Sequence, residues 1–329
     1  MIFMTGATGH IGNVLARELV LRGEKVRVLV LPGEDTDSLQ GVDVEQVIGD
    51  VLDTEQLAAA MEDAELVYHL AGVISIMPGP NPLMRKVNVD GTRNVLQAAR
   101  QAGVKRLIYT SSIHALERPI DGRIINEDLK FDPYNPAGEY DRTKAEATLA
   151  VQEAVNDGLD AVIVCPTGVI GPHDYRKSEL GLLIWSWARR RLNLLVDGVF
   201  DFADVRDIAK GHILAAEHGR CGETYILGGE LISIARLWAI AREVAGSHSQ
   251  GLILPFNLAA FAARFTPYYY RLTGQKAQFT EYALHTVNTK SPISHDKATL
   301  ELGYQPRPLV ETIQDTIRWW QSLSTSLTA

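Results

Sequence analysis

The sequence has little cysteine, no excess of basic residues and no long apolar run. Cys165 and Cys221 are its two cysteines among 329 residues, and they form no metal-type pair. A disulfide framework and a metal site are therefore not expected, and reduced thiols are the simplest interpretation. The formal net charge of −8 disfavours a protein that works by neutralising nucleic-acid phosphates. No stretch reaches the ~18 consecutive apolar residues that a transmembrane helix needs.

The start of the chain also leaves no room for a secretory leader, because a glycine-rich stretch begins at Gly6. We therefore expect a cytoplasmic protein without a transmembrane segment. The length and the 46% hydrophobic content allow one large domain or two moderate ones with a substantial core.

Strand-like and helical segments alternate in the first half of the chain. The apolar, strand-like runs are 1–5, 25–31, 44–50, 64–72, 104–112 and 159–168. The helical stretches between them are 11–23, 54–62, 83–103 and 140–158. Strands that are apolar throughout and joined by helices indicate an α/β fold with a doubly wound parallel sheet, covered on both faces.

The pattern changes after about Gly168, where the segments become longer, more helical and more aromatic. Helices are expected over 181–195, 232–246, 254–272 and 309–323. No linker rich in Gly, Ser or Pro separates the two halves. We therefore expect a smaller, mainly helical second lobe that packs against the first domain.

Gly6, Gly9 and Gly12 lie between the first strand and the first helix. At this place Gly6 would permit a tight turn, Gly9 would let the backbone approach a pyrophosphate, and Gly12 would let helix and strand pack closely. The N–H groups and the positive dipole end of the helix favour an anion there. An ordinary glycine-rich turn is the alternative, but the strand–turn–helix context favours a dinucleotide site.

The Gly-x-x-Gly-x-x-Gly spacing resembles the extended branch of the short-chain dehydrogenase/reductase superfamily, which includes NAD-dependent epimerases and dehydratases. "GDVLD" at 49–53, "HLAG" at 69–72 and "NVDGTRN" at 88–94 match further motifs of the family in the same order. The resemblance covers essentially the whole chain. It implies a Rossmann-type NAD(P)-binding domain at 1–168 and a substrate-binding lobe at 169–329, from which some elements return to the first domain.

The resemblance also implies which residues contact the cofactor. Asp50 would accept from the adenine amine, and the 166–169 segment would lie beside the nicotinamide carboxamide. The expected cofactor contacts are Gly6, Thr8, Gly9, His10, Ile11, Gly12, Leu31, Asp50, Val51, Leu70, Ala71, Gly72, Thr110, Tyr140, Lys144, Pro166, Thr167, Gly168 and Val169.

Tyr140 and Lys144 are four residues apart on a predicted helix, so their side chains share a face. A nearby ammonium lowers the pKa of a phenol and so makes it a better acid–base group near neutral pH. The resemblance assigns proton transfer to Tyr140, the nicotinamide ribose to Lys144 and the substrate oxygen to Ser112. Strand alternation predicts that Thr110 and Ser112 lie on the same face of the strand and that Ser111 lies on the opposite face. An exposed helix face and strand-end capping are the alternative interpretations.

The end of the second strand normally decides between NAD and NADP, through an acid or an arginine. Val30 and Leu31 occupy that place here, which departs from the family pattern. Glu34 and Asp35 follow and would repel a 2′-phosphate, and no basic residue lies nearby in sequence. NAD is therefore favoured, with NADP as the alternative.

Two enzyme classes fit the extended branch. One interconverts a carbonyl and an alcohol, as in dihydroflavonol reductases, 3β-hydroxysteroid dehydrogenases and bacterial aldehyde reductases. The other epimerises or dehydrates nucleotide sugars with tightly bound NAD. Phe200 stands where an arginine commonly grips the sugar diphosphate, which favours the first class, although Arg176, Arg206 or the 188–191 run could substitute. A cofactor-sensing protein is disfavoured because Tyr140 and Lys144 are both present.

The partner expected from this sequence is a small-molecule substrate, not a nucleic acid. Trp185, Trp187, Phe200 and Phe202 could line an apolar pocket or pack as core. "FTPYYYRL" at 265–272 is an aromatic and basic stretch that could touch a membrane surface or a partner. The resemblance further implies a homodimer formed through helices at roughly 84–102 and 139–156.

Overall fold

The computed structural model describes residues 1–119, 122–274, 279–288 and 291–326. Two short 3₁₀ turns, η1 (Asp37–Leu39) and η3 (Ile113–Ala115), and one π-helical segment, η2 (Lys86–Gly91), accompany the regular elements. The strands are β1 (Ile2–Thr5), β2 (Val26–Val30), β3 (Glu45–Ile48), β4 (Leu66–His69), β5 (Arg106–Thr110), β6 (Ala161–Pro166), β7 (Gly168–Ile170), β8 (Leu192–Val196), β9 (Val199–Asp204), β10 (Thr224–Leu227), β11 (Glu230–Ser233) and β12 (Gln250–Leu254). The helices are α1 (His10–Leu21), α2 (Thr54–Ala60), α3 (Pro82–Arg85), α4 (Thr92–Gln101), α5 (Glu139–Asn156), α6 (Glu179–Arg189), α7 (Val205–His218), α8 (Ile234–Val244), α9 (Phe256–Ala263), α10 (Thr266–Thr273), α11 (Glu281–Val287), α12 (Asp296–Leu302) and α13 (Leu309–Ser326).

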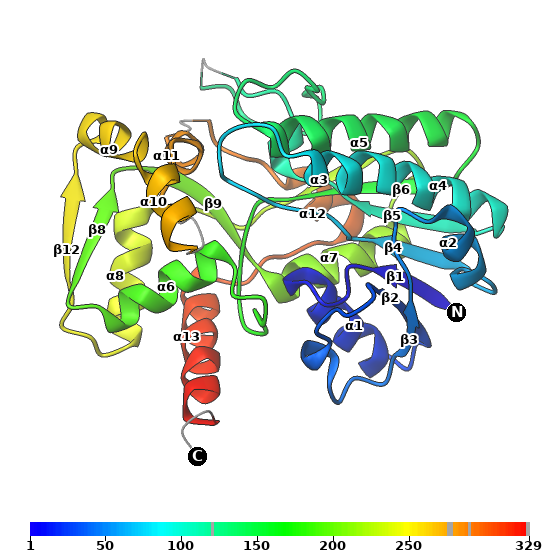
Figure 1. The fold of residues 1–329 in the computed structure, drawn as a ribbon, viewed down its shortest axis with the longest axis horizontal. Coiled ribbons are helices and arrows are strands. Elements are labelled where there is room, and N and C mark those ends of the chain that lie inside the picture. Colours follow the sequence, from blue (N-terminus) through cyan, green and yellow to red (C-terminus); the bar gives the residue numbers. More distant parts are fainter. Residues whose placement is uncertain (120–121, 275–278, 289–290, 327–329) are drawn as a thin grey trace.

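The central element is a seven-stranded sheet in the order β10-β6-β5-β4-β1-β2-β3 (Figure 1). Every neighbouring pair in it is parallel, so the predicted doubly wound α/β sheet is confirmed. The strand order reverses at β1, which pairs with β2 on one side and β4 on the other. The carboxyl ends of strands at such a reversal form the crevice where open α/β sheets bind ligands.

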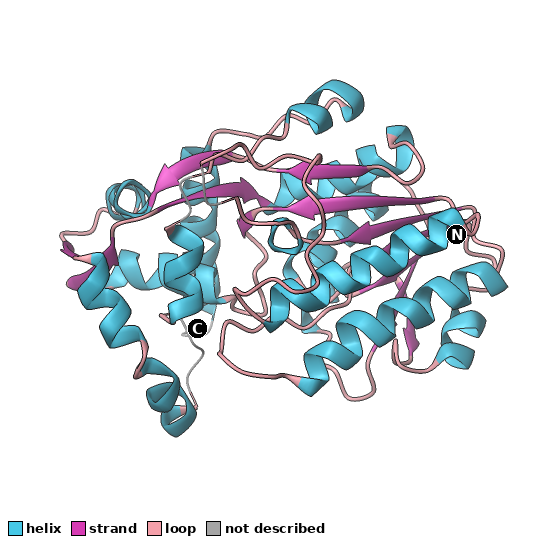
Figure 2. Cartoon of the chain, turned by 90° about the horizontal axis from the view of Figure 1, so that it is seen from above, coloured by secondary structure: helices cyan, strands magenta, loops and turns pink. Residues whose placement is uncertain are grey.

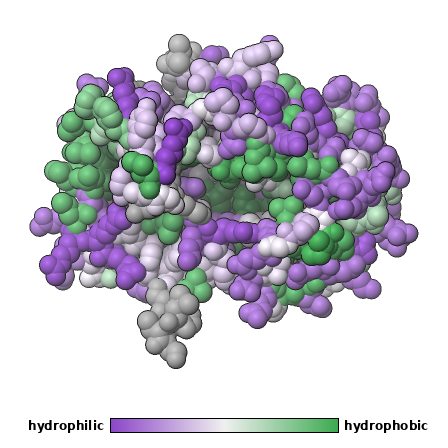
Figure 3. Space-filling model, in the orientation of Figure 1, coloured by the Kyte–Doolittle hydropathy of each residue, from purple (hydrophilic) through white to green (hydrophobic). Residues whose placement is uncertain are grey.

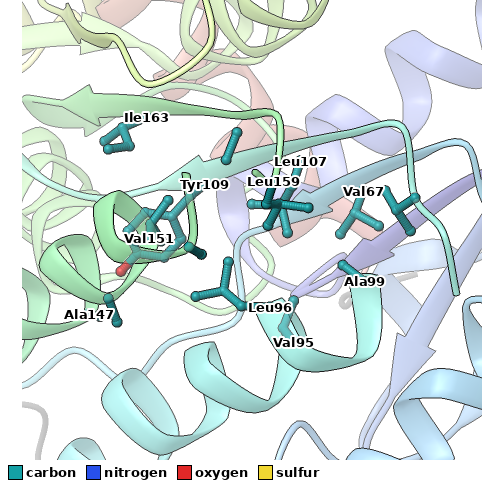
Figure 4. Close-up of a cluster of buried hydrophobic side chains, with 14 of the residues drawn as sticks. Val67, Val95, Leu96, Ala99, Leu107, Tyr109, Ala147, Val151, Leu159 and Ile163 are labelled. Atoms are coloured by element: carbon teal, nitrogen blue, oxygen red, sulfur yellow. The ribbon is translucent and has the colours of Figure 1, made fainter. Parts of the chain in front are cut away.

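Helices cover both faces of this sheet, as Figure 2 shows from above. The α2, α4 and α5 helices bury one apolar cluster, in which Val95, Leu96 and Val151 pack against Leu107 and Tyr109 of β5 (Figure 4). The α1, α7 and α12 helices bury a second cluster on the opposite face. These two cores hold the carboxyl ends of β1, β4 and β5 in fixed positions.

The second half of the chain is mainly helical, as predicted, with two small sheets in the orders β11-β9-β7 and β12-β8. The prediction of one helix over 181–195 was wrong at its end, because α6 stops at Arg189 and Leu192–Val196 pairs with β12 as a strand. The prediction of one helix over 254–272 was also wrong. Pro267 lies in the first turn of α10, where its missing N–H and fixed φ favour a new helix start.

Some elements of the second half return to the central sheet. β10 pairs with β6 at the sheet edge, and α7 and α12 cover the face that α1 also covers. The division into domains at 168/169 therefore stays a prediction, since later elements also join the first domain. In the part of the chain that the structure describes, no helix has the length and apolar character to cross a membrane.

Candidate active site

A cavity of about 1100 Å³ lies between the carboxyl edge of the sheet and the second lobe. Figure 3 shows a hollow on this face with hydrophobic side chains at its floor. The predicted site residues that line the cavity are Gly6, Gly9, His10, Ile11, Gly12, Leu70, Gly72, Thr110, Ser112, Tyr140, Lys144, Pro166, Thr167, Gly168 and Val169. Residues from motifs far apart in sequence thus meet at one cavity.

The glycine loop between β1 and α1 has no room for larger residues. Gly6 has φ +75°, and a Cβ added there would lie 2.7 Å from the backbone nitrogen of Ala71. A Cβ on Gly12 would lie 2.2 Å from the Gly6 carbonyl oxygen. Gly9 is the N-cap residue just before α1, whose first-turn N–H groups have no partner inside the helix. Because the loop holds its backbone open beside a helix N-terminus, it fits a dinucleotide pyrophosphate.

Thr8, Glu34 and Arg176 meet on top of this loop. The Thr8 hydroxyl donates to Glu34 Oε1 at 2.6 Å, and the backbone N–H of Leu31 donates to Glu34 Oε2 at 3.0 Å. Arg176, which follows β7, donates to Thr8 Oγ1 at 2.9 Å and forms an ion pair with Glu34. Arg176 was not expected beside Glu34, because it comes from a distant part of the chain.

Thr8, Leu31, Asp50, Val51 and Ala71 are the expected cofactor contacts that do not line the cavity. The Asp50 carboxylate accepts from the N–H of Leu52 at 3.0 Å, and Val51 is buried. The Ala71 N–H donates to Thr5 Oγ1 at 3.1 Å. Their roles toward a cofactor stay predictions.

Tyr140 and Lys144 lie in the first turns of α5, and both line the cavity. Burial raises the pKa of Tyr140 to about 12, and a hydrogen bond with Ser112 lowers it in part. Burial lowers the pKa of Lys144 to about 8, and its ammonium donates to the Thr110 carbonyl at 2.7 Å. We expected Lys144 to depress the phenol pKa, but the desolvation of the buried ring outweighs its neighbours.

The three consecutive hydroxyl residues at the end of β5 have different partners. Thr110 Oγ1 lies 2.8 Å from His212 Nε2 on α7, and Ser111 Oγ lies 2.6 Å from Thr148 Oγ1 on α5. Ser112 Oγ accepts from the backbone N–H of His114 at 3.2 Å, and it also lies close enough to Tyr140 to lower the pKa of that phenol in part. The prediction that Thr110 and Ser112 share a face was wrong, because β5 ends at Thr110 and strand alternation does not extend beyond it.

A buried polar cluster next to Tyr140 was not predicted from the sequence. Asp141 is fully buried and accepts from Arg118 Nη2 at 2.6 Å. His114 lies 3.6 Å from the same carboxylate and stacks on Phe200, with ring centroids 5.9 Å apart. The sequence offered one signal for this cluster: His114 follows Ser112 by only two residues, so it had to lie near the predicted site.

Most residues that line the cavity are apolar. Its charged lining residues, among those that the structure describes, are Lys144, Glu179 and Arg190, with His10 and His114. Arg206 is paired with Asp204 and Asp315 outside the cavity. Trp187, Phe200 and Phe202 line the cavity, whereas Trp185 stacks on Trp320 and does not.

Comparisons with known proteins place this geometry in context. The sequence profile of the NAD dependent epimerase/dehydratase family matches residues 2–228. The chain is 34% identical to sterol demethylase protein B of Methylococcus capsulatus, with 97% of each chain covered. It is 30% identical to a putative dihydroflavonol 4-reductase of Synechocystis, with 97% of this chain and 94% of that protein covered. The crystal structure of gox2253 superimposes with a TM-score of 0.85 at 33% identity, covering 98% of both chains.

Proposed function

We propose that this chain, which belongs to the NAD-dependent epimerase/dehydratase family, is an oxidoreductase that interconverts an apolar carbonyl compound and its alcohol. The family's cofactor is NAD, which when bound accepts or supplies the hydride. The observation that carries the proposal is the continuity between the Ser112–Tyr140–Lys144 group and an apolar cavity.

In the reductive direction the carbonyl carbon gains a hydride and its oxygen gains a proton, so that one C=O becomes one CH–OH. Tyr140, with a pKa of about 12, keeps its proton at neutral pH and can donate it to the oxygen. Ser112, which lines the cavity together with Tyr140, would hold the same oxygen. Lys144, with a pKa of about 8, is mostly protonated at neutral pH and would stabilise negative charge on that oxygen and bind the nicotinamide ribose.

The substrate class follows from the charges of the cavity. A sugar diphosphate needs cationic partners to replace the water that it loses. Phe200 lies in the cavity, and Arg190 is the one arginine among the described lining residues. This supports an apolar carbonyl substrate. Arg190 also keeps a nucleotide-sugar epimerase or dehydratase as the second candidate, which the same family includes.

Glu34 supports NAD over NADP in this proposal. Its carboxylate is held at the end of β2 by the Leu31 N–H and by Thr8, where Rossmann-type folds use an acid to bind the adenosine ribose. Glu34 thus takes the role expected of the Leu31 position. Arg176 pairs with it and would position the carboxylate.

We also propose that the chain forms a cytoplasmic homodimer through α4 and α5. These helices pack beside each other over the sheet (Figure 1), and Leu149 on α5 is 39% exposed. Sedimentation equilibrium of the wild type and of Leu149→Glu tests this assembly, because a charge at a self-associating apolar contact weakens it.

The experiment that tests the function is oxidation of NADH and NADPH by purified protein with a panel of apolar aldehydes, ketones and ketosteroids. Net oxidation in proportion to the alcohol formed is expected. Conversion of nucleotide sugars without net oxidation would establish the second candidate. Cofactor binding with no turnover of either panel would indicate a sensing protein.

A further inference from the structure

Helices α9 and α10 present large apolar side chains to solvent. These side chains, each more than half exposed, are Leu258, Phe261, Phe265, Tyr268 and Leu272. We call them the α9–α10 surface. Leu252 and Ile253 of the preceding strand β12 are also about half exposed. Figure 3 shows hydrophobic colouring at this end of the molecule, over β12 and α9. Exposed apolar groups that gather in this way mark an interaction surface.

The same two helices also line the cavity. Ala262, Thr266, Tyr269 and Tyr270 face the cavity, and they alternate along the helices with residues of the α9–α10 surface. Cavity and surface are therefore separated by the thickness of one helical layer. The lining residues from α9 and α10 bring this surface next to a mainly apolar cavity.

The charge of this segment differs from the rest of the chain. The protein has 40 acidic residues among 329, yet residues 250–274 contain Arg264 and Arg271 and no acidic residue. Arg264 pairs with Glu281 of α11 at 3.2 Å. Arg271 lies exposed in the last turn of α10, beside Leu272. A chain of net charge −8 thus turns a locally cationic, apolar end outward.

We infer that the α9–α10 surface docks on an anionic lipid bilayer, with the apolar side chains in the interfacial layer and Arg271 at the headgroups. Aromatic and aliphatic side chains flanked by basic residues are the composition of interfacial helices. The absence of acidic residues in 250–274 complements anionic headgroups. This docking would deliver a lipid-soluble substrate from the bilayer to the cavity, a role that rests on the proposed function.

Docking is tested by sedimentation of the full-length protein with sucrose-loaded vesicles, without cofactor or substrate. The vesicles are phosphatidylcholine alone or phosphatidylcholine with 30% phosphatidylglycerol as a design value. The double variant Phe261→Ser/Phe265→Ser changes two rings that touch each other, with centroids 5.4 Å apart, and that do not line the cavity. Leu300→Ser is the matched control, because Leu300 is 84% exposed on α12.

The wild type is expected to bind the anionic vesicles at least about fivefold more tightly than the neutral ones. The double variant should lose about tenfold or more of that binding, and Arg271→Gln about fivefold, while Leu300→Ser binds as the wild type does. No vesicle binding by the wild type, or equal binding by the double variant, would overturn the inference. So would a dimer in solution that the double variant abolishes, since a second copy would then cover this surface.

Failure of docking and failure of the proposed function are distinguishable. Oxidation of NADH with a water-soluble ketone reports the chemistry without vesicles, and the double variant should keep it within about twofold, because the changed rings lie outside the cavity. If the wild type binds vesicles but shows no NADH oxidation with a panel of such ketones, the oxidoreductase assignment alone would fail.

Discussion

Arg176 lies 142 positions after Glu34 in the chain, and the two side chains form an ion pair on top of the glycine loop. The pair also engages the Thr8 hydroxyl, and the Pro172 carbonyl just before Arg176 lies 2.9 Å from His10 Nε2. A segment of the second half of the chain thus crosses the loop that would hold the cofactor. We therefore expect cofactor choice to depend on both halves of the protein.

The first prediction concerns this pair. Glu34→Gln removes a negative charge next to Arg176, which would then face a 2′-phosphate without a competing carboxylate. The ratio of kcat/KM for NADPH to that for NADH should rise by about tenfold or more. Asp35→Asn removes the same charge one residue away and should leave the ratio within about twofold. Equal ratios for wild type and Glu34→Gln would remove Glu34 from cofactor choice.

Tyr140→Phe deletes the hydroxyl that holds the transferable proton in a buried site. Turnover should fall by about 10²-fold or more, while NADH affinity measured by fluorescence titration stays within about threefold. The ring and its packing are retained, so the fold should persist. An active Tyr140→Phe enzyme would refute the assignment of the proton donor.

Two adjacent serines separate a role toward substrate from a role in packing. Ser112 lines the cavity beside Tyr140, whereas the Ser111 hydroxyl lies 2.6 Å from Thr148 Oγ1 on α5. Ser112→Ala should reduce kcat by about 10²-fold, the usual cost of one donor to a developing oxyanion. Ser111→Ala should keep kcat within about threefold and lower the melting temperature instead. The reverse pattern would mean that the substrate oxygen faces Ser111.

Lys144 predicts a pH dependence of the reaction. Burial lowers its pKa to about 8, so the ammonium is present below that pH and is lost as the pH rises through it. Because Tyr140 keeps its proton to about 12, kcat for carbonyl reduction should fall about tenfold per pH unit above about 8. Lys144→Arg stays charged throughout and should remove this decline. A flat wild-type profile from pH 7 to 10 would contradict the role of the ammonium.

His69 predicts a pH dependence of stability. It lies under the glycine loop between Thr5 Oγ1 at 2.8 Å and Thr92 Oγ1 at 3.0 Å, and burial lowers its pKa from 6.5 to about 3. As the pH falls below 6.5, the unfolded chain binds a proton that the folded chain refuses. The free energy of unfolding should therefore fall by about 1.4 kcal/mol per pH unit from this group.

Urea unfolding between pH 7.5 and 5 measures this dependence. His69→Gln should show a smaller slope than the wild type, and the exposed His248→Gln serves as the control. If His69→Gln and wild type lose stability in parallel, His69 is not the neutral buried group described here.

Much of the fold could be predicted, because its signals are local. Strands that are apolar throughout, joined by helices, indicated the parallel sheet, and the Gly6–Gly12 spacing located the loop that the structure places at the sheet's carboxyl edge. Tyr140 and Lys144 were predictable as neighbours because residues four positions apart on a helix lie on the same face.

What could not be predicted depends on contacts between distant segments. Arg176 reaches Glu34 because the second half folds back over the first. The pKa of Tyr140 rises because residues from several elements exclude water from its ring. The strand at Leu192–Val196 forms because β12 pairs with it, a partner that lies more than fifty residues away.

The most direct test of the account is to follow deuterium from NADH that carries deuterium at both nicotinamide C4 positions into the product of an apolar ketone that the enzyme reduces. The account predicts one deuterium at the carbinol carbon for each NADH oxidised, and none with Tyr140→Phe, which should not turn over. Conversion of a nucleotide sugar with no net NADH oxidation, and no transfer to any apolar carbonyl, would contradict it.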